Sequence, residues 1–295
     1  MWITALLAVL SLAQAPAQAD HPVLIAPLNA PCPAFLYAAE GDGGWILRFN
    51  REGKIDWSFR APMSRDVWQL PGGNVLLAFN EKYDPRGHDN PSGVMEVDPA
   101  GKVVWRFDTK GQVWACQRLA DGNTLIGAAS QGKVLIVSPA GKIVREVRVR
   151  NAPGHSCMRH ARALADGTIL VAEESAKAIR QYDPQGRFVR EMTVPFPPFS
   201  VCRLPNGHTL TSGKTHLVEL DEAGKIVWSL DGKDYPDLGV RWLAGLQVLP
   251  NGNIFCCNAG GKVGFIEFSR DKKVAWASND KPIRLPAGHG VHLLP

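Results

Sequence analysis

The sequence contains no stretch of about 20 consecutive apolar residues, the length that a transmembrane helix requires. It also lacks a block of lysine and arginine. The formal charge of +5 is spread along the chain, which argues against a nucleic-acid partner. Six cysteines form no Cys-x-x-Cys pair, and six in a chain of this length do not describe a disulfide scaffold. The sequence leaves open whether one or two disulfides form and which cysteines they would join.

Charged side chains are also missing from the first 19 residues. An apolar run from Trp2 to Leu12 is followed by the small-residue pattern Ala17-Gln18-Ala19, although the usual early lysine or arginine is absent. This pattern predicts a signal peptide over residues 1–19 and therefore a periplasmic or secreted protein. Residues 20–34 then form an N-terminal lead, and residues 35–295 a single domain.

A short pattern recurs along that domain: a leucine followed by a tight turn with glycine, as in LPNGN. The pattern returns roughly every 45 residues, at Leu70, Leu119, Leu164, Leu204 and Leu249. A second turn pattern, as in DPAGK, lies out of phase with the first and ends at Lys54, Lys102, Lys142, Arg187, Lys225 and Lys273. Self-similarity at a fixed period indicates a repeat architecture.

Each of these turns joins two β-rich segments. Asn-Gly and Asp-Gly between alternating apolar residues favour hairpin turns, and segments such as KVVWRF alternate in the manner of half-buried strands. One repeat therefore holds four antiparallel strands, which is typical of a β-propeller blade. A tryptophan at one fixed place in the fourth strand of four repeats indicates packing within the repeat: Trp57, Trp105, Trp228 and Trp276.

The two ends of the repeat region are incomplete in complementary ways. The first repeat starts at FLYAAEG and lacks its first strand, whereas the last segment, GHGVHLLP, supplies a first strand alone. The sequence thus predicts an all-β fold: a six-bladed β-propeller of four-stranded antiparallel blades, closed by the C-terminal strand completing blade one. Such closure removes open sheet edges.

The repeats GKVVW and LPNGN resemble those of quinoprotein-like (PQQ-like) and arylsulfotransferase-like β-propellers over nearly the whole chain after residue 19. The resemblance implies the fold. Quinoprotein dehydrogenases are usually eight-bladed and longer, so we expect no quinone or other cofactor. Arylsulfotransferases use a histidine ahead of an Asn-Ser pair, and the corresponding segment here, His155–His160, has no such pair.

Antiparallel blades allow each loop to be assigned to one of two faces. The Leu-x-x-Gly and Asp-x-x-Gly turns share one face, which we call the turn face. The longer and dissimilar connections share the other, which we call the irregular face. Six of the eight histidines map to the irregular face: His88, His155, His160, His216, His289 and His292. Irregular loops on a regular scaffold usually carry binding groups, so we expect the functional site there.

The candidate ligand-binding residues lie in these connections or just before a first strand. Arginine holds carboxylate, sulfate or phosphate, histidine transfers protons near neutral pH, and tryptophan stacks on sugar rings. Arg159 and His160 stand five and four places before their turn leucine, as Arg65 and Asp66 do, so we expect these side chains to meet across one cavity. The full set is Arg65, Asp66, Arg159, His160, Glu173, Lys214, Arg241, Trp242 and His289.

The segment GHSCMRH, residues 154–160, raises two sharper hypotheses. A metal site is one, but no adjacent pair has a recognised ligand spacing and residues five apart on a strand point to opposite sides, so we predict no metal. A Cys157 nucleophile with a histidine base is the other, but it lacks a third orienting group. We expect Cys157 to be packed or disulfide-bonded.

Two classes of function remain. The first is an exported propeller that binds a small polar or anionic ligand, carbohydrates included, in the funnel on the irregular face. The alternative is a hydrolase, lyase or transferase that uses histidine and arginine for acid–base chemistry in the same funnel. No motif identifies catalytic residues, so enzymatic activity stays open. An enzyme would need a histidine, a carboxylate and an arginine within hydrogen-bond reach of one vacant point. We expect a monomer.

Overall fold

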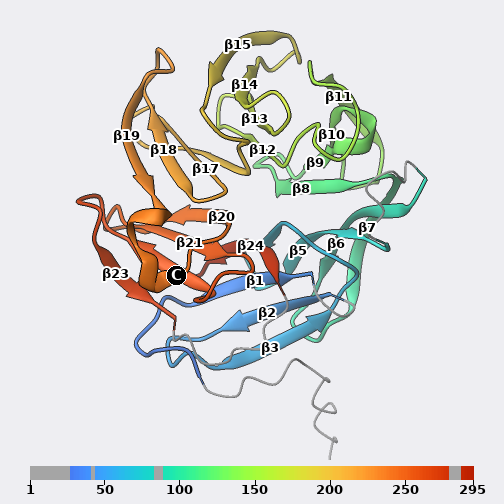
Figure 1. Cartoon of the computed structure of the whole chain (residues 1–295). Coiled ribbons are helices and arrows are strands. Elements are labelled where there is room, and N and C mark those ends of the chain that lie inside the picture. Colours follow the sequence, from blue (N-terminus) through green and yellow to red (C-terminus); the bar gives the residue numbers. More distant parts are fainter. Residues whose placement is uncertain (1–26, 41–43, 83–88, 279–286) are drawn as a thin grey trace, which may run out of the picture.

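The computed structural model describes residues 27–40, 44–82, 89–278 and 287–295. Six four-stranded antiparallel sheets are arranged as a ring around a central axis (Figure 1). The predicted six-bladed β-propeller is thereby confirmed. The predicted signal peptide and the first part of the lead lie outside the described residues. Within the described ranges, no helix is long and apolar enough to cross a membrane.

Each blade has four strands, which we letter a to d from the axis outward. In that order, blade one contains β24 (Gly288–Leu293), β1 (Phe35–Ala39), β2 (Trp45–Phe49) and β3 (Ile55–Arg60). Blade two contains β4 (Val67–Gln69), β5 (Val75–Asn80), β6 (Pro91–Val97) and β7 (Val103–Lys110). Blade three contains β8 (Val113–Arg118), β9 (Thr124–Ala128), β10 (Lys133–Val137) and β11 (Ile143–Arg148).

The remaining three blades follow the same order. Blade four contains β12 (His160–Ala163), β13 (Ile169–Glu173), β14 (Ala178–Tyr182) and β15 (Phe188–Thr193). Blade five contains β16 (Ser200–Arg203), β17 (Thr209–Gly213), β18 (His216–Leu220) and β19 (Ile226–Asp231). Blade six contains β20 (Leu243–Val248), β21 (Ile254–Asn258), β22 (Phe265–Phe268) and β23 (Val274–Ala277). Three short 3₁₀ turns complete the elements: η1 (Ala129–Gln131), η2 (Gly232–Asp234) and η3 (Pro236–Leu238).

The ring closes in blade one, where β24 pairs with β1 in the predicted antiparallel manner, with Leu293 opposite Phe35 (Figure 1). The closing strand also lies tightly against blade six. A Cβ atom added to Gly245 of β20 would fall 2.4 Å from the carbonyl oxygen of His289, so only glycine permits this approach. The C-terminal strand therefore contacts both neighbours of the ring seam.

One position of strand d fastens each blade to the next. The indole Nε1 of Trp57, Trp105 and Trp228 donates a hydrogen bond of 2.9 Å to a backbone carbonyl in the c–d turn of the following blade. In blades three and four, Arg145 and Arg190 occupy this position and donate to the corresponding carbonyls of Pro184 and Glu222. In blade six, Trp276 donates to Asn29 of the N-terminal lead.

The cysteines are part of the packing. All six are free thiols, and five of them are buried. The disulfides that the sequence left open are not formed.

Candidate functional site

Side chains at one equivalent position in the blades form a ring about the central axis on the irregular face. The position lies five residues before the turn leucine, near the start of each a strand. In blade six, a β-bulge between Leu243 and Leu246 changes the register, and Trp242 takes the corresponding place. We call these side chains the axial ring: Arg65, Trp114, Arg159, Phe199, Trp242 and His289.

Aromatic contacts join one half of the axial ring. The rings of Phe199 and His289 stack with centroids 5.0 Å apart and an interplanar angle of 19°. Trp242 meets both edge-on, at 5.8 Å from Phe199 and 6.4 Å from His289. The guanidinium carbon of Arg159 lies 5.7 Å from the centre of the Phe199 ring. Three blades thus contribute flat apolar surfaces beside a cation.

Both arginines of the axial ring are almost fully buried, and each is held by a glutamate from a b–c loop. Arg159 Nε donates to Glu174 Oε2 over 2.7 Å, and Arg65 Nε donates to Glu40. The Arg65 guanidinium also lies 4.0 Å above the Trp114 ring. Buried charges require such partners, because an unpaired charge away from water is strongly destabilising.

Glu40 contacts a second member of the axial ring as well. His289 Nδ1 lies 2.5 Å from Glu40 Oε1, so the imidazole and the carboxylate are in direct contact. Burial opposes ionisation of Glu40, but His289 and Arg65 together hold its pKa below the ordinary value. Burial lowers the pKa of His289 despite Glu40. The carboxylate of Glu40 is therefore in contact with both the imidazole of His289 and the guanidinium of Arg65.

A second group lies further along the a strands, and we call it the channel cluster: Asp66, Trp68, His160, Arg162 and His292. Arg162 of blade four donates two hydrogen bonds to Asp66 of blade two, over 2.7 and 2.8 Å. Its guanidinium lies 4.7 Å above Trp68, whose ring is 4.9 Å from that of His292. Asp66 and Arg162 thus connect two blades that are not neighbours in the ring.

The predicted residues fall into four places. Arg65, Arg159, Trp242 and His289 belong to the axial ring, whereas Asp66 and His160 belong to the channel cluster. Lys214 and Arg241 are exposed. Glu173 is fully buried within blade four, where it accepts hydrogen bonds from Tyr182 over 2.8 Å and Arg180 over 2.5 Å. Burial raises the pKa of Glu173.

Four residues of the site are not among those predicted from the sequence: Glu40, Glu174, Trp114 and Phe199. The position five places before the turn leucine identifies Trp114 and Phe199 once all blades are aligned. The glutamates have no such signal, because their loops differ in length and sequence between blades.

The segment GHSCMRH places its polar groups in several environments. Cys157 is buried, and burial together with Glu173 raises the pKa of its thiol to about 12, so the thiolate needed for nucleophilic attack is not formed near neutral pH. His155 Nδ1 lies 3.0 Å from Gln112 Oε1, and its ring meets Trp114 edge-on. Among the described residues, no group of three histidine, cysteine or acidic side chains is arranged to hold a metal ion.

We expect the stability of the protein to fall as the pH decreases from about 6.5, the ordinary pKa of histidine in an unfolded chain. Burial, with Arg162 nearby, lowers the pKa of His160 to about 3, and its Nδ1 accepts a hydrogen bond of 3.1 Å from the Val201 amide. Burial likewise lowers the pKa of His292 to about 4. The unfolded chain therefore binds protons that the folded protein does not, and the loss approaches about 1.4 kcal/mol per pH unit at His160.

The measurement is the free energy of unfolding by urea between pH 6.5 and 4. His160→Gln, whose amide oxygen can still accept from the Val201 amide, should reduce the slope by about one proton, while His216→Gln at a half-exposed site serves as the control. An unchanged slope in His160→Gln would show that His160 titrates normally in the folded protein.

No protein-family model matches the chain, and no curated protein matches it. Solved structures do. A protein of unknown function from Bacteroides caccae has a TM-score of 0.73 and 21% identity, covering 88% of this chain and 98% of that one. A catalytically inactive histidine-to-alanine variant of virginiamycin B lyase from Staphylococcus aureus, with quinupristin, has a TM-score of 0.60 and 13% identity, covering 87% and 88%. A chain of a nidogen/laminin complex has a TM-score of 0.65 and 11% identity, covering 88% and 97%. These similarities show a shared fold, which by itself does not determine function.

Proposed function

We propose that the protein binds a small polar ligand with an acidic group, such as a sugar acid, at the axial ring on its irregular face. The observation that carries the proposal is the axial ring itself. Equivalent positions of the six blades combine two buried guanidinium groups with aromatic rings and an imidazole. The pattern of residues 1–19 supports a periplasmic or secreted location, and we propose a monomer.

The glutamates prepare the arginines for such a ligand. A guanidinium carries five N–H donors in one plane, and Glu40 and Glu174 contact their arginines at Nε. Each contact fixes the plane of the guanidinium, so less side-chain freedom is lost when a carboxylate binds. Phe199 and Trp242 add apolar faces against which a sugar ring can stack.

Isothermal titration with glucuronate, compared with uncharged glucose, tests this proposal. We expect glucuronate to bind more tightly than glucose, because only glucuronate presents a carboxylate to the arginines. Arg159→Gln should weaken glucuronate binding at least tenfold, whereas Lys142→Gln, an exposed cation on the turn face, should leave it unchanged. Equal binding of the two sugars, or full glucuronate affinity in Arg159→Gln, would contradict the proposal.

Acid–base catalysis at the same site is a second candidate, because Glu40 contacts both His289 and Arg65. In an elimination, neutral His289 would accept the proton from the carbon beside a ligand carboxylate held by Arg65. The electron pair of that C–H bond would form a C=C bond as the neighbouring C–O bond breaks, and the departing oxygen would take up a proton. Virginiamycin B lyase, which has the same fold, is a lyase that a histidine-to-alanine change inactivates.

Proton NMR of a glucuronate-containing disaccharide incubated with the protein separates the two candidates. New vinyl signals that are lost in His289→Ala would establish a lyase, whereas binding without product would establish a binding protein.

Sulfuryl transfer, which the resemblance to arylsulfotransferase-like propellers suggests, has less support. Burial, with Arg159 and Arg65 nearby, lowers the pKa of His155 to about 4, and its Nδ1 is engaged by Gln112.

A further inference from the structure

Clefts open on the turn face between neighbouring blades, and one of about 410 Å³ lies between blades one and two, where strand d of blade one carries Trp57. A cleft of about 560 Å³ lies between blades three and four, and another of about 360 Å³ lies between blades four and five. Arg145 lines the first and Arg190 the second. These are the two blades in which arginine replaces the tryptophan that fastens strand d to the next blade in the other four. The first cleft has the volume of a typical small-molecule site.

The replacement changes both the shape and the charge of the gap. Both side chains donate to a carbonyl of the next c–d turn, as Trp105 does to Pro139 and Arg145 to Pro184, but the guanidinium is charged and flexible where the indole is neutral and bulky. The residue paired with this position in strand c also differs. It is Glu96, Glu219 or Glu267 where strand d carries tryptophan in blades two, five and six, but Ile136 opposite Arg145.

Arg145 is consequently a cation without a carboxylate. Among the described residues it forms no ion pair, and its buried Nε has no hydrogen-bond partner. The other cation of the cleft, Arg118, is paired with Glu96 over 2.6 Å. The single acid of the cleft lining, Asp121, accepts hydrogen bonds from the amide and side chain of Asn123.

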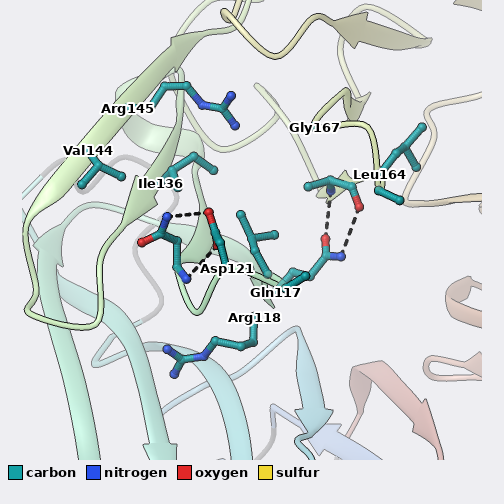
Figure 2. Close-up of a pocket in the computed structure, with 13 residues that line it drawn as sticks. Gln117, Arg118, Asp121, Ile136, Val144, Arg145, Leu164 and Gly167 are labelled. Carbon is teal, nitrogen blue, oxygen red and sulfur yellow. Dashed lines mark hydrogen bonds between the residues drawn. The ribbon is translucent and has the colours of Figure 1, made fainter.

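The walls around Arg145 are largely apolar. Figure 2 shows Arg145 near Ile136 and Val144 on blade three, with Leu164 of blade four across the cleft and Arg118 at its far end. The floor is rigid, because the Gln117 side chain accepts from the Ala163 amide over 2.8 Å and donates to the Ala163 carbonyl over 3.2 Å. The cleft thus has largely apolar walls, a cation without an ion-pair partner in Arg145, and one carboxylate in Asp121.

We propose that this cleft is a second ligand site, which takes a compact monocarboxylic acid with an apolar body. The carboxylate pairs with the guanidinium of Arg145, and the apolar body lies against Ile136, Val144 and Leu164. The site is on the opposite face from the axial ring, and it does not depend on the function proposed there.

The neighbouring cleft between blades four and five does not suit the same ligand. Arg190 Nε already donates to Gln181 over 2.9 Å, and the lining has two carboxylates, Asp166 and Glu222, beside a second cation, Arg203, whereas the first cleft has one carboxylate. Like charges would repel a bound acid. This difference supplies a matched control, since the two clefts share the same place in the repeat.

Benzoate and its neutral counterpart benzamide, titrated into the full-length protein and followed by ¹H–¹⁵N NMR, test the proposal. We expect benzoate to bind at least tenfold more tightly than benzamide and to shift the Gly167 amide and the Gln117 side-chain amide. Arg145→Trp restores the residue that four other blades carry, so it should fold, fill the cleft and reduce benzoate affinity at least tenfold. Arg190→Trp should leave benzoate binding unchanged.

Arg145→Gln removes the charge but keeps the cleft open, and it decides the matter if Arg145→Trp does not fold. In this variant benzoate should bind no better than benzamide. Three results would overturn the proposal: equal binding of the two probes to the unmodified protein, full benzoate affinity in Arg145→Gln, or benzoate-induced shifts confined to the axial ring.

Discussion

Removing residues 287–295 should abolish the cooperative fold of the propeller. The deletion takes away β24, the innermost strand of blade one, which pairs with β1 from Phe35 to Ala39. Phe35 and Tyr37 would lose their cover on the axis side, and the backbone of β1 would become an unpaired sheet edge.

The loss extends beyond blade one. The Leu293 amide donates to the side chain of Gln247 over 2.5 Å, and the thiol of Cys257 donates to the His289 carbonyl over 3.3 Å. Gln247 and Cys257 of blade six would therefore each lose a hydrogen-bond partner. We expect a fall of more than about 5 kcal/mol, which is comparable to the whole stability of a typical domain.

Urea unfolding followed by tryptophan fluorescence measures this effect. A synthetic peptide of residues 287–295, added in trans, should restore part of the lost stability if the strand acts by completing blade one. A truncated protein with the midpoint of the full chain would contradict closure by β24.

Asp66→Ala should destabilise the protein by about 3–5 kcal/mol, the usual cost of removing one partner of a buried ion pair. Asp66 is 2% exposed and accepts from the Cys116 amide over 2.8 Å in addition to both hydrogen bonds from Arg162. Its removal leaves the largely buried guanidinium of Arg162 without a carboxylate and the buried amide of Cys116 without its acceptor.

The double variant Asp66→Ala/Arg162→Met separates the two contributions. Replacing the guanidinium by an apolar side chain should recover a large part of the loss, because the unpaired charge is then gone. Asp56→Ala, in the exposed pair with Arg48, serves as the control and should have a much smaller effect. An equal loss in the single and double variants would show that Arg162 does not carry the cost.

The fold could be predicted from the sequence because the repeats specify it many times over. Five copies of the first turn and six of the second define the strands, and the incomplete ends define the closure; glycine stands at the fixed place in all of these turns except the last second turn, where Lys272 takes it. The glycines are required there: Gly122 and Gly141, for example, have φ of 83° and 75°. If the turn in one repeat is misassigned, comparison with the other repeats corrects the assignment.

The site was less predictable because it depends on what differs between blades. Trp242 reaches the axial ring through a β-bulge that no local pattern announces. Glu40 and Glu174 come from loops without a common length. Arg162 is a strand residue by its position, yet its side chain extends to blade two. The cleft at Arg145 could not be predicted either, because the regular turns of that face give no reason to expect a binding site there.

The seam in blade one also determines when the molecule can fold. β1 is synthesised before the other described strands and β24 after them, and yet the two are paired neighbours. During translation, blades two to six can assemble in chain order from contacts between successive residues. Blade one must wait for a pairing that spans nearly the whole chain, and pairings of such long range form slowly. Until β24 takes its place, the protein is an open arc in which the β1 edge is unpaired.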